Sequence, residues 1–336
     1  MEILDCTLRD GANIVGKGFS SKLTISIIEG LIRSNIRIIE FGNALGLGAY
    51  EANGAFAPMT DREYLDLVQP YVDKAELGMF MNWQNGSVAN ISLAKEASLS
   101  FLRVGANAGM GGSACSTVER VKSAGLKTRY SLMKAYTLTP EQLAEEAALL
   151  ESYGLDEITI MDSAGTMLPE EVKKYVETMK NRISIPIGFH GHNNLGLSVA
   201  NALAARDAGA ELFDTGLMGM ARSAGNLATE VAIAVFQRQG QFQNYDLYQL
   251  LDFIDHELAP EMMLHNYQAA ISPNELILGV TGCHSSFEGL FNEVAAQYNV
   301  PVYPLISRVS RNNKRSPSRE LIQQEAQVLS KFSSPQ

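Results

Sequence analysis

Two histidines separated by a single residue are the side chains in this sequence that most clearly indicate a chemical role. They occur in the segment Phe189-His190-Gly191-His192-Asn193, and the whole chain holds only five histidines. Side chains of an extended segment alternate between two faces, so both imidazoles point to the same side. Paired imidazoles at a strand end could form half of a divalent-metal site, which a carboxylate oxygen would complete. The alternative is that both rings only hydrogen-bond within the core, and spacing alone leaves these two interpretations balanced.

A second pair of residues that could take part in a reaction lies near the N-terminus, where Arg9 and Asp10 follow a short apolar segment. Asp10 is the candidate carboxylate of the metal site, because the first and last strands become neighbours when a barrel closes. Arg9 could hold a carboxylate or keto-acid oxygen with two N–H groups and stabilise negative charge during a reaction. The alternative for Arg9 is a structural ion pair with Glu40 or Asp162.

The elements that must position these residues follow a regular order. Short apolar segments alternate with segments of helical periodicity. The strands are apolar rather than alternating, which is typical of a parallel sheet buried on both faces. We expect strands at residues 2–6, 37–41, 75–81, 101–104, 127–132, 157–161, 185–189 and 212–214, and helices at 22–34, 61–71, 88–97, 116–124, 140–153, 169–180, 196–208 and 228–239.

Eight strand–helix units predict an α/β fold, a (β/α)₈ TIM barrel over residues 1–240. The segment after the first strand reads Thr-Leu-Arg-Asp-Gly rather than GxGxxG, so a dinucleotide-binding fold is excluded. Beyond residue 240 the alternation stops, and residues 246–259, 273–280 and 287–297 show helical character. We therefore expect residues 241–336 to form a helical C-terminal extension.

In such a barrel the functional residues gather where the strands end. On this basis Arg9, Glu40, Asp162 and Thr215 are predicted to contact a substrate. Residues 219–226 (Gly-Met-Ala-Arg-Ser-Ala-Gly-Asn) follow the eighth strand. This small-residue loop either makes a tight turn, the interpretation that its composition favours, or brings Asn226 toward the metal.

Composition excludes several classes of function. Lys and Arg number 27 against 37 for Asp and Glu, a net charge of −10, which argues against sequence-independent nucleic-acid binding. The three cysteines are too few and too far apart for a disulfide scaffold or a zinc ribbon. No apolar run approaches the about 18 residues of a membrane span, and the start lacks a secretory signal pattern. We expect a cytoplasmic protein without membrane or nucleic-acid partners.

Four motifs occur in order at the predicted strand ends, at residues 7–11, 162–165, 190–194 and 224–226. Together they resemble the metal-dependent superfamily of 3-hydroxy-3-methylglutaryl-CoA lyase, isopropylmalate synthase and 4-hydroxy-2-oxovalerate aldolase, with the aldolase branch most similar. The resemblance extends to about residue 300 and includes residues 39–46 and 285–287. It implies a small 2-keto acid substrate, Arg9 as the residue that stabilises a pyruvate enolate, and Mn²⁺ or Mg²⁺ at Asp10, His190 and His192, with Asn226 in the place of a fourth ligand.

Two positions depart from the aldolase branch. Asn13 stands where that branch has the histidine expected to take the proton of the substrate hydroxyl, and an amide cannot take up a proton at neutral pH. His284 stands where the branch has a tyrosine before Ser-Ser-Phe. We predict that His284 takes over the acid/base role; the alternative is a lost activity or a changed substrate.

The resulting prediction is a metal-dependent aldolase that cleaves or forms a carbon–carbon bond of a 4-hydroxy-2-keto acid. The alternatives are a Claisen-type acyltransferase similar to isopropylmalate synthase, and a catalytically silent barrel that acts as a binding partner. The C-terminal helices could bury a homodimer contact. The aldolase branch often works with an aldehyde dehydrogenase partner, and residues 308–321 depart from the usual ending of that branch.

Overall fold

The barrel predicted from the sequence is present in the structure, a computed structural model that describes all residues except 55, 271–272, 284, 314–315 and 333–336. Eight parallel strands close into a single sheet in sequence order, and β1 pairs with β8 so that Asp5 lies opposite Thr215. The strands are β1 (Glu2–Asp5), β2 (Ile38–Glu40), β3 (Glu76–Asn82), β4 (Phe101–Asn107), β5 (Lys127–Met133), β6 (Glu157–Asp162), β7 (Ile187–Gly191) and β8 (Leu212–Thr215).

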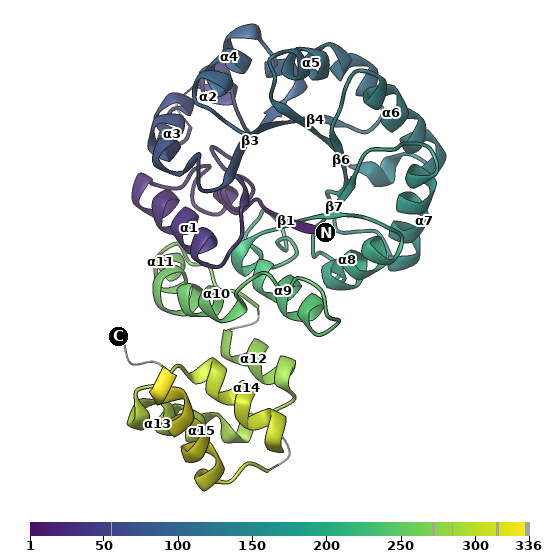
Figure 1. Ribbon diagram of the computed structural model, residues 1–336. Helices are drawn as coiled ribbons and strands as arrows, with labels where there is room; N and C mark the ends of the chain where they lie inside the picture. Colours follow the sequence, from purple (N-terminus) through teal and green to yellow (C-terminus); the bar gives the residue numbers. More distant parts are fainter. Residues whose placement is uncertain (55, 271–272, 284, 314–315, 333–336) are drawn as a thin grey trace.

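Helices form the outer ring around this sheet, as Figure 1 shows. Their apolar faces pack on the outer side of the strands in one continuous core. The ring consists of α1 (Ser21–Arg33), α2 (Ala49–Asn53), α3 (Asp61–Val68), α4 (Val88–Glu96), α5 (Gly111–Ser123), α6 (Pro140–Ser152), α7 (Pro169–Lys180), α8 (Ser198–Asp207) and α9 (Thr229–Gln237).

Local sequence explains where these helices begin. The Thr139 side chain accepts the N–H of Gln142, whose side chain in turn accepts the N–H of Thr139, and Pro140 occupies the first helical position of α6. Helix α5 begins at Gly111, five residues before the expected start. The sequence missed this first turn because Gly111 and Gly112 have poor intrinsic helix propensity, which packing in the barrel overrides.

Further helices follow the barrel. Helix α10 (Leu247–Phe253) packs against α1 and α9, and a wider turn at Ile254–Leu258 joins it to α11 (Ala259–Leu264). The next four helices pack mainly on one another and lie together below α9 and α10 in Figure 1. They are α12 (Pro273–Thr281), α13 (Glu288–Tyr298), α14 (Val302–Asn313) and α15 (Arg319–Phe332). The last two were not expected from the sequence.

None of the helices that the structure describes combines the length and the apolar character needed to cross a membrane.

The inner face of the barrel has its own small apolar floor. A cluster separate from the main core joins residues of four strands or their ends: Leu4, Cys6, Ile38, Phe101 and Leu212. Since side chains alternate along a strand, the residues two positions further on also face the interior. These positions hold Glu40, Arg103 and Asp214, so polar groups lie directly above the apolar floor.

Candidate active site

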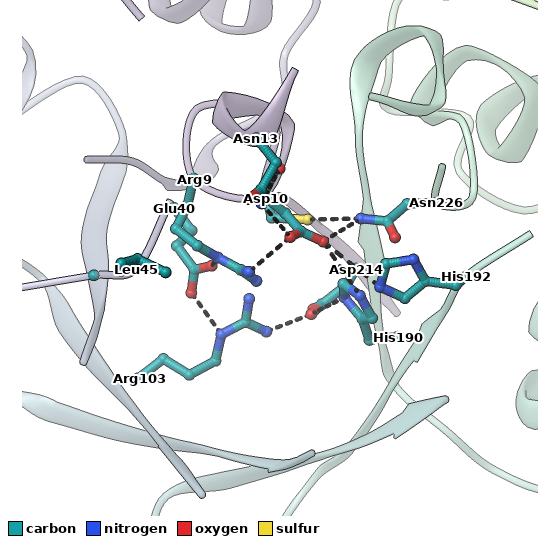
Figure 2. Close-up of polar contacts among 12 residues, drawn as sticks. Arg9, Asp10, Asn13, Glu40, Leu45, Arg103, His190, His192, Asp214 and Asn226 are labelled. Atoms are coloured by element: carbon teal, nitrogen blue, oxygen red, sulfur yellow. Dashed lines mark hydrogen bonds and ion pairs between the residues drawn. The ribbon is translucent and has the colours of Figure 1, made fainter. Parts of the chain in front are cut away.

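Asp10 lies at the centre of a cluster of polar groups at the C-terminal ends of the strands (Figure 2). It lies after β1 and directly before a short helical turn that begins at Gly11, and 2% of its surface is exposed. Its Oδ2 accepts a hydrogen bond of 2.8 Å from Asn226 Nδ2. Its Oδ1 lies 3.1 Å from Arg9 Nη1. The loop after β8 and the turn after β1 therefore meet at one carboxylate.

The two histidines approach the same carboxylate from β7. His190 Nε2 is 3.6 Å and His192 Nε2 is 3.9 Å from Asp10 Oδ2, and both rings are buried. These separations are too long for hydrogen bonds. Two imidazole nitrogens thus lie within 4 Å of one carboxylate oxygen, at a point where ligands of these types could hold a cation.

The unpartnered atoms around this point also suit a cation. His192 Nδ1 and Asn226 Oδ1 are buried and have no hydrogen-bond partner among the residues that the structure describes. Rotating the Asn226 amide by 180° would put Oδ1 where Nδ2 now lies, beside Asp10 Oδ2. Asn226 could then offer that oxygen to a cation as a ligand. The Cys6 thiol lies beside the cluster, with its sulfur within 4.8 Å of the ligand atoms of Asp10 and His190, and it donates to the Thr215 carbonyl at 3.1 Å.

A chain of buried ion pairs connects Arg9 with His190 (Figure 2). Arg9 Nε lies 2.5 Å from one oxygen of Glu40, and Arg103 Nε lies 2.5 Å from the other. Arg103 Nη1 then pairs with Asp214 Oδ2, which also lies 3.0 Å from His190 Nδ1. A rigid series of alternating charges thus crosses the barrel interior.

This alternation of charges controls ionisation. Burial opposes the charged form of Asp10, but Arg9 and His190 outweigh it and hold its pKa well below the usual range. Burial also opposes ionisation of Glu40, whose pKa is lowered because Arg103 and Arg9 flank it. Burial likewise opposes ionisation of Asp214, but Arg103 and His190 lower its pKa to about 2. All three carboxylates are therefore ionised at neutral pH.

The ionisation state leaves the cluster with an excess of negative charge. Two guanidinium groups oppose three carboxylates. Burial and the neighbouring His190 lower the pKa of His192 to about 4, so that ring is neutral at physiological pH and free to act as a ligand. The arginines and carboxylates alone thus leave one negative charge, which favours a cation in this buried site. A bound divalent ion would turn the balance positive and favour an anionic substrate carboxylate.

Asn13 is close to Asp10 but is engaged in local contacts. Its Nδ2 donates to the Asp10 backbone oxygen at 2.9 Å and lies 3.4 Å from Asp10 Oδ1. Its Oδ1 accepts from Lys17 Nζ at 2.8 Å. Asn13 therefore orients the turn that carries Asp10.

Two of the expected substrate contacts lie on the other side of the sheet. Asp162 accepts the N–H groups of Thr166 and Met167, at 3.0 and 2.9 Å, and so caps the turn before α7. Thr215 Oγ1 accepts from Thr229 of α9 at 2.9 Å. The structure brings neither side chain onto Arg9, because each is one residue out of phase with the inward-facing positions of its strand. His284 lies outside the described residues.

Arg103 and Asp214 are the members of the cluster that the sequence did not single out. Both are fully buried, at 0% and 1% exposure. A charged residue in the middle of the apolar segment Phe-Leu-Arg-Val-Gly was an available signal, since an arginine is rarely buried without a partner. Asp214 and Thr215 are adjacent in β8, so alternation along the strand puts them on opposite faces, and Asp214 shares the face of Leu212.

Comparison with known proteins identifies the lineage of this cluster. A family model described as HMGL-like matches residues 1–256. The chain belongs to the HMGL-like family. Its relatives include 4-hydroxy-2-oxovalerate aldolase 2 of Nocardia farcinica, 36% identical over 92% of this chain and 88% of the relative. The 4-hydroxy-2-oxovalerate aldolase of Carboxydothermus hydrogenoformans is 32% identical over 98% of each chain.

Solved structures share the fold of this chain. The 3-hydroxy-3-methylglutaryl-CoA lyase of Bacillus subtilis superposes with a TM-score of 0.67 at 18% identity and covers 83% of this chain and 97% of its own. The carboxyl transferase domain of Rhizobium etli pyruvate carboxylase also gives 0.67, at 14% identity, and covers 99% of this chain and 61% of its own. At these identities the likeness shows a shared fold.

Proposed function

We propose that this HMGL-like chain is a divalent-metal-dependent aldolase that cleaves a 4-hydroxy-2-keto acid into pyruvate and an aldehyde, or joins the two. The observation that carries the proposal is the approach of His190 and His192 to one oxygen of Asp10, whose other oxygen pairs with the Arg9 guanidinium. The names of the relatives, all 4-hydroxy-2-oxovalerate aldolases at 30–36% identity, support the same reaction class.

The donor set favours Mn²⁺ or Mg²⁺ held by Asp10, His190 and His192, with Asn226 as a further oxygen ligand. When bound, the ion supplies Lewis-acid polarisation of the 2-keto group. An octahedral ion of either kind accepts carboxylate and amide oxygens, and imidazole is better suited to Mn²⁺.

Arg9 provides the charge stabilisation that the reaction needs. In cleavage the bond between C3 and C4 breaks, its electron pair enters the pyruvate enolate, and the hydroxyl proton on C4 leaves as the aldehyde forms. Arg9 Nη2 is buried and has no partner among the described side chains and backbone groups. Because Glu40 and Asp10 hold the rest of the guanidinium, this free N–H group can donate to the enolate oxygen without reorganisation.

The proton of the C4 hydroxyl needs an acceptor. Asn13 cannot serve, since its amide is not basic and its polar atoms are occupied by Asp10 and Lys17. On sequence grounds we propose His284 for this role, in a helical extension spanning residues 241–336 that adds to a catalytic barrel of residues 1–240. Replacing His284 by Ala or Phe should abolish cleavage while leaving enolate formation from pyruvate.

The test uses the purified full-length chain with added Mn²⁺. We expect pyruvate to form from 4-hydroxy-2-oxovalerate, and the methyl protons of pyruvate to exchange with deuterium in D₂O. Asp10→Asn should lose both reactions. Asp162→Asn, a matched change of a buried carboxylate outside the cluster, should retain them where the protein folds.

Two outcomes would favour the other functions. Mn²⁺ binding without exchange on any 2-keto acid would indicate a catalytically silent barrel. Release of a thiol from an acyl-CoA in the presence of a 2-keto acid would indicate a Claisen-type acyltransferase.

A further inference from the structure

Asp214 contacts two members of the cluster through a single oxygen. Its Oδ2 pairs with Arg103 Nη1 and lies 3.0 Å from His190 Nδ1. An ionised carboxylate can only accept hydrogen bonds. His190 Nδ1 therefore donates to Asp214, and Nε2 is the ring nitrogen left to offer a lone pair to a cation.

The consequence appears on the other side of the same ring. His190 Nε2 faces Asp10 Oδ2 at 3.6 Å, so the nitrogen that Asp214 does not engage is the one turned toward the Asp10 carboxylate. A cation between these two atoms would be held by the nitrogen lone pair and the carboxylate oxygen. Hydrogen bonding at one nitrogen of an imidazole thus decides what the other nitrogen can bind.

We infer that Asp214 is a positioning residue that fixes His190 in the Nδ1-protonated form and so aims Nε2 at the metal. The inference rests on the proposed function, because it assigns a role within the same metal site. Asp214 touches neither the proposed ion nor the substrate and acts only through His190.

Arg103 keeps Asp214 in place for this role. Its guanidinium spans from Asp214 to Glu40, and all three side chains are fully buried. The fork geometry of a guanidinium fixes both carboxylates relative to each other. Since Glu40 also holds Arg9, the orientation of the histidine ligand and that of the enolate-stabilising guanidinium depend on one connected set of contacts.

His192 differs from His190 in this respect. Its Nδ1 is buried and has no partner within the described part of the chain. Nothing in its surroundings selects one tautomer, so it can present either nitrogen after a ring flip. Of the two histidines, only His190 is oriented in advance.

The first experiment reads the tautomer directly. Histidine ¹⁵N shifts are recorded on the full-length protein after removal of divalent ions by a chelator, with the His190 signals assigned by their loss in His190→Ala. The spectra are followed to a pH at which the ring is neutral, and we expect Nδ1 to be the nitrogen that keeps the proton in the wild type. A neutral ring protonated at Nε2 would overturn the inference.

The second experiment measures Mn²⁺ affinity from the electron paramagnetic resonance of free Mn²⁺. In Asp214→Asn the amide can donate to Nδ1 and move the proton to Nε2, so we expect affinity to fall about 10- to 100-fold. Asp5→Asn is the matched control: Asp5 is a buried aspartate on the adjacent strand β1, but it faces α9 and accepts from Thr229.

The outcomes separate the positioning role of Asp214 from the proposed metal-dependent function. Equal Mn²⁺ affinity in wild type and Asp214→Asn would overturn the positioning role while leaving the metal site intact. A wild-type protein that binds no Mn²⁺ would overturn the proposed function, whereas the tautomer measurement would still decide the state of His190. Should Asp214→Asn fail to fold, the wild-type tautomer remains the deciding measurement.

Discussion

Arg9 is anchored by Glu40: the Arg9 Nε and Glu40 Oε1 atoms are 2.5 Å apart in the barrel interior, and Glu40 is fully buried. The other oxygen of Glu40 is equally close to Arg103 Nε. One carboxylate therefore holds two guanidinium groups, which would otherwise repel each other. With Glu40 at Nε and Asp10 at Nη1, Arg9 Nη2 has no hydrogen-bond partner among the residues that the structure describes.

Glu40→Gln should impair chemistry more than metal binding. A glutamine side chain offers one acceptor oxygen, so it can hold Arg9 or Arg103 but not both. We expect the rate of deuterium exchange into pyruvate to fall about 100-fold, as misplacement of a catalytic group by about 1 Å does, with Mn²⁺ affinity retained. Glu157→Gln is the control, because Glu157 is a buried partner of Arg129 at the start of β6. Equal losses of exchange in both variants would contradict the role of Glu40.

Arg103→Met should destabilise the protein. The change leaves the Glu40 and Asp214 carboxylates buried without their shared partner. Removing one member of a buried ion pair costs about 3–5 kcal/mol. Urea denaturation measures this loss as a lower midpoint at unchanged slope. A loss below about 1 kcal/mol would show that water or another group replaces the guanidinium.

The sequence predicted the barrel because its main signals are local and repetitive. Apolar strand segments followed by helical periodicity recur eight times, caps such as Thr139 mark several of the helix starts, and all eight strands form. Helices α14 and α15 are strongly amphipathic, so their periodicity was an available signal that was overlooked once the strand–helix alternation had stopped. The long-range pairing of Glu40 with Arg103 could not be predicted, since it depends on barrel closure and strand register.

Within the candidate site, the residues near strand ends were easier to predict than the side of the sheet to which a residue within a strand points. Asp10, His190 and His192 were singled out by residue type and spacing, and the structure brings them together. Thr215 was singled out and Asp214 was not, although the two point to opposite sides of β8. A shift of one residue exchanges the inner face for the outer face, and apolar neighbours on both faces give no sign of which is which.

Asn13→Ala should affect metal binding modestly and leave proton transfer unchanged. The Asn13 amide only supports the turn around Asp10. We expect Mn²⁺ affinity to fall by less than about tenfold, the lower end of the effect of a supporting contact. The pH dependence of cleavage should keep its shape. Loss of a limb of that profile in Asn13→Ala, rather than in His284→Ala, would place the proton acceptor near Asn13 instead.

Glu230→Gln should make stability less dependent on pH. Burial raises the pKa of Glu230 from 4.5 to about 7, while its Oε2 accepts the Met218 N–H at 3.1 Å. Between these values the unfolded chain is ionised and the folded chain is protonated, so the wild type loses stability as pH rises from about 4.5 through 7. The shift corresponds to about 3 kcal/mol.

The measurement for Glu230 is a series of urea unfolding curves at several pH values. Glutamine can accept the same N–H without a charge, so the variant should match the wild type at pH 4.5 and exceed its stability at pH 8. A constant difference across this range would mean that Glu230 is ionised in the folded protein.

Gly225→Ala should weaken metal binding through its neighbour Asn226. Gly225 has a φ of 84°, and an added Cβ would lie 2.3 Å from the Gly219 carbonyl oxygen. Both the left-handed conformation, which costs about 1–2 kcal/mol for a non-glycine residue, and this contact would displace the loop that carries Asn226. Gly240→Ala is the matched control, since its φ is 79° and nothing lies within 4 Å of the added Cβ. We expect both variants to lose stability and only Gly225→Ala to lose Mn²⁺ affinity; an equally tight Mn²⁺ complex in both would remove Asn226 from the set of ligands.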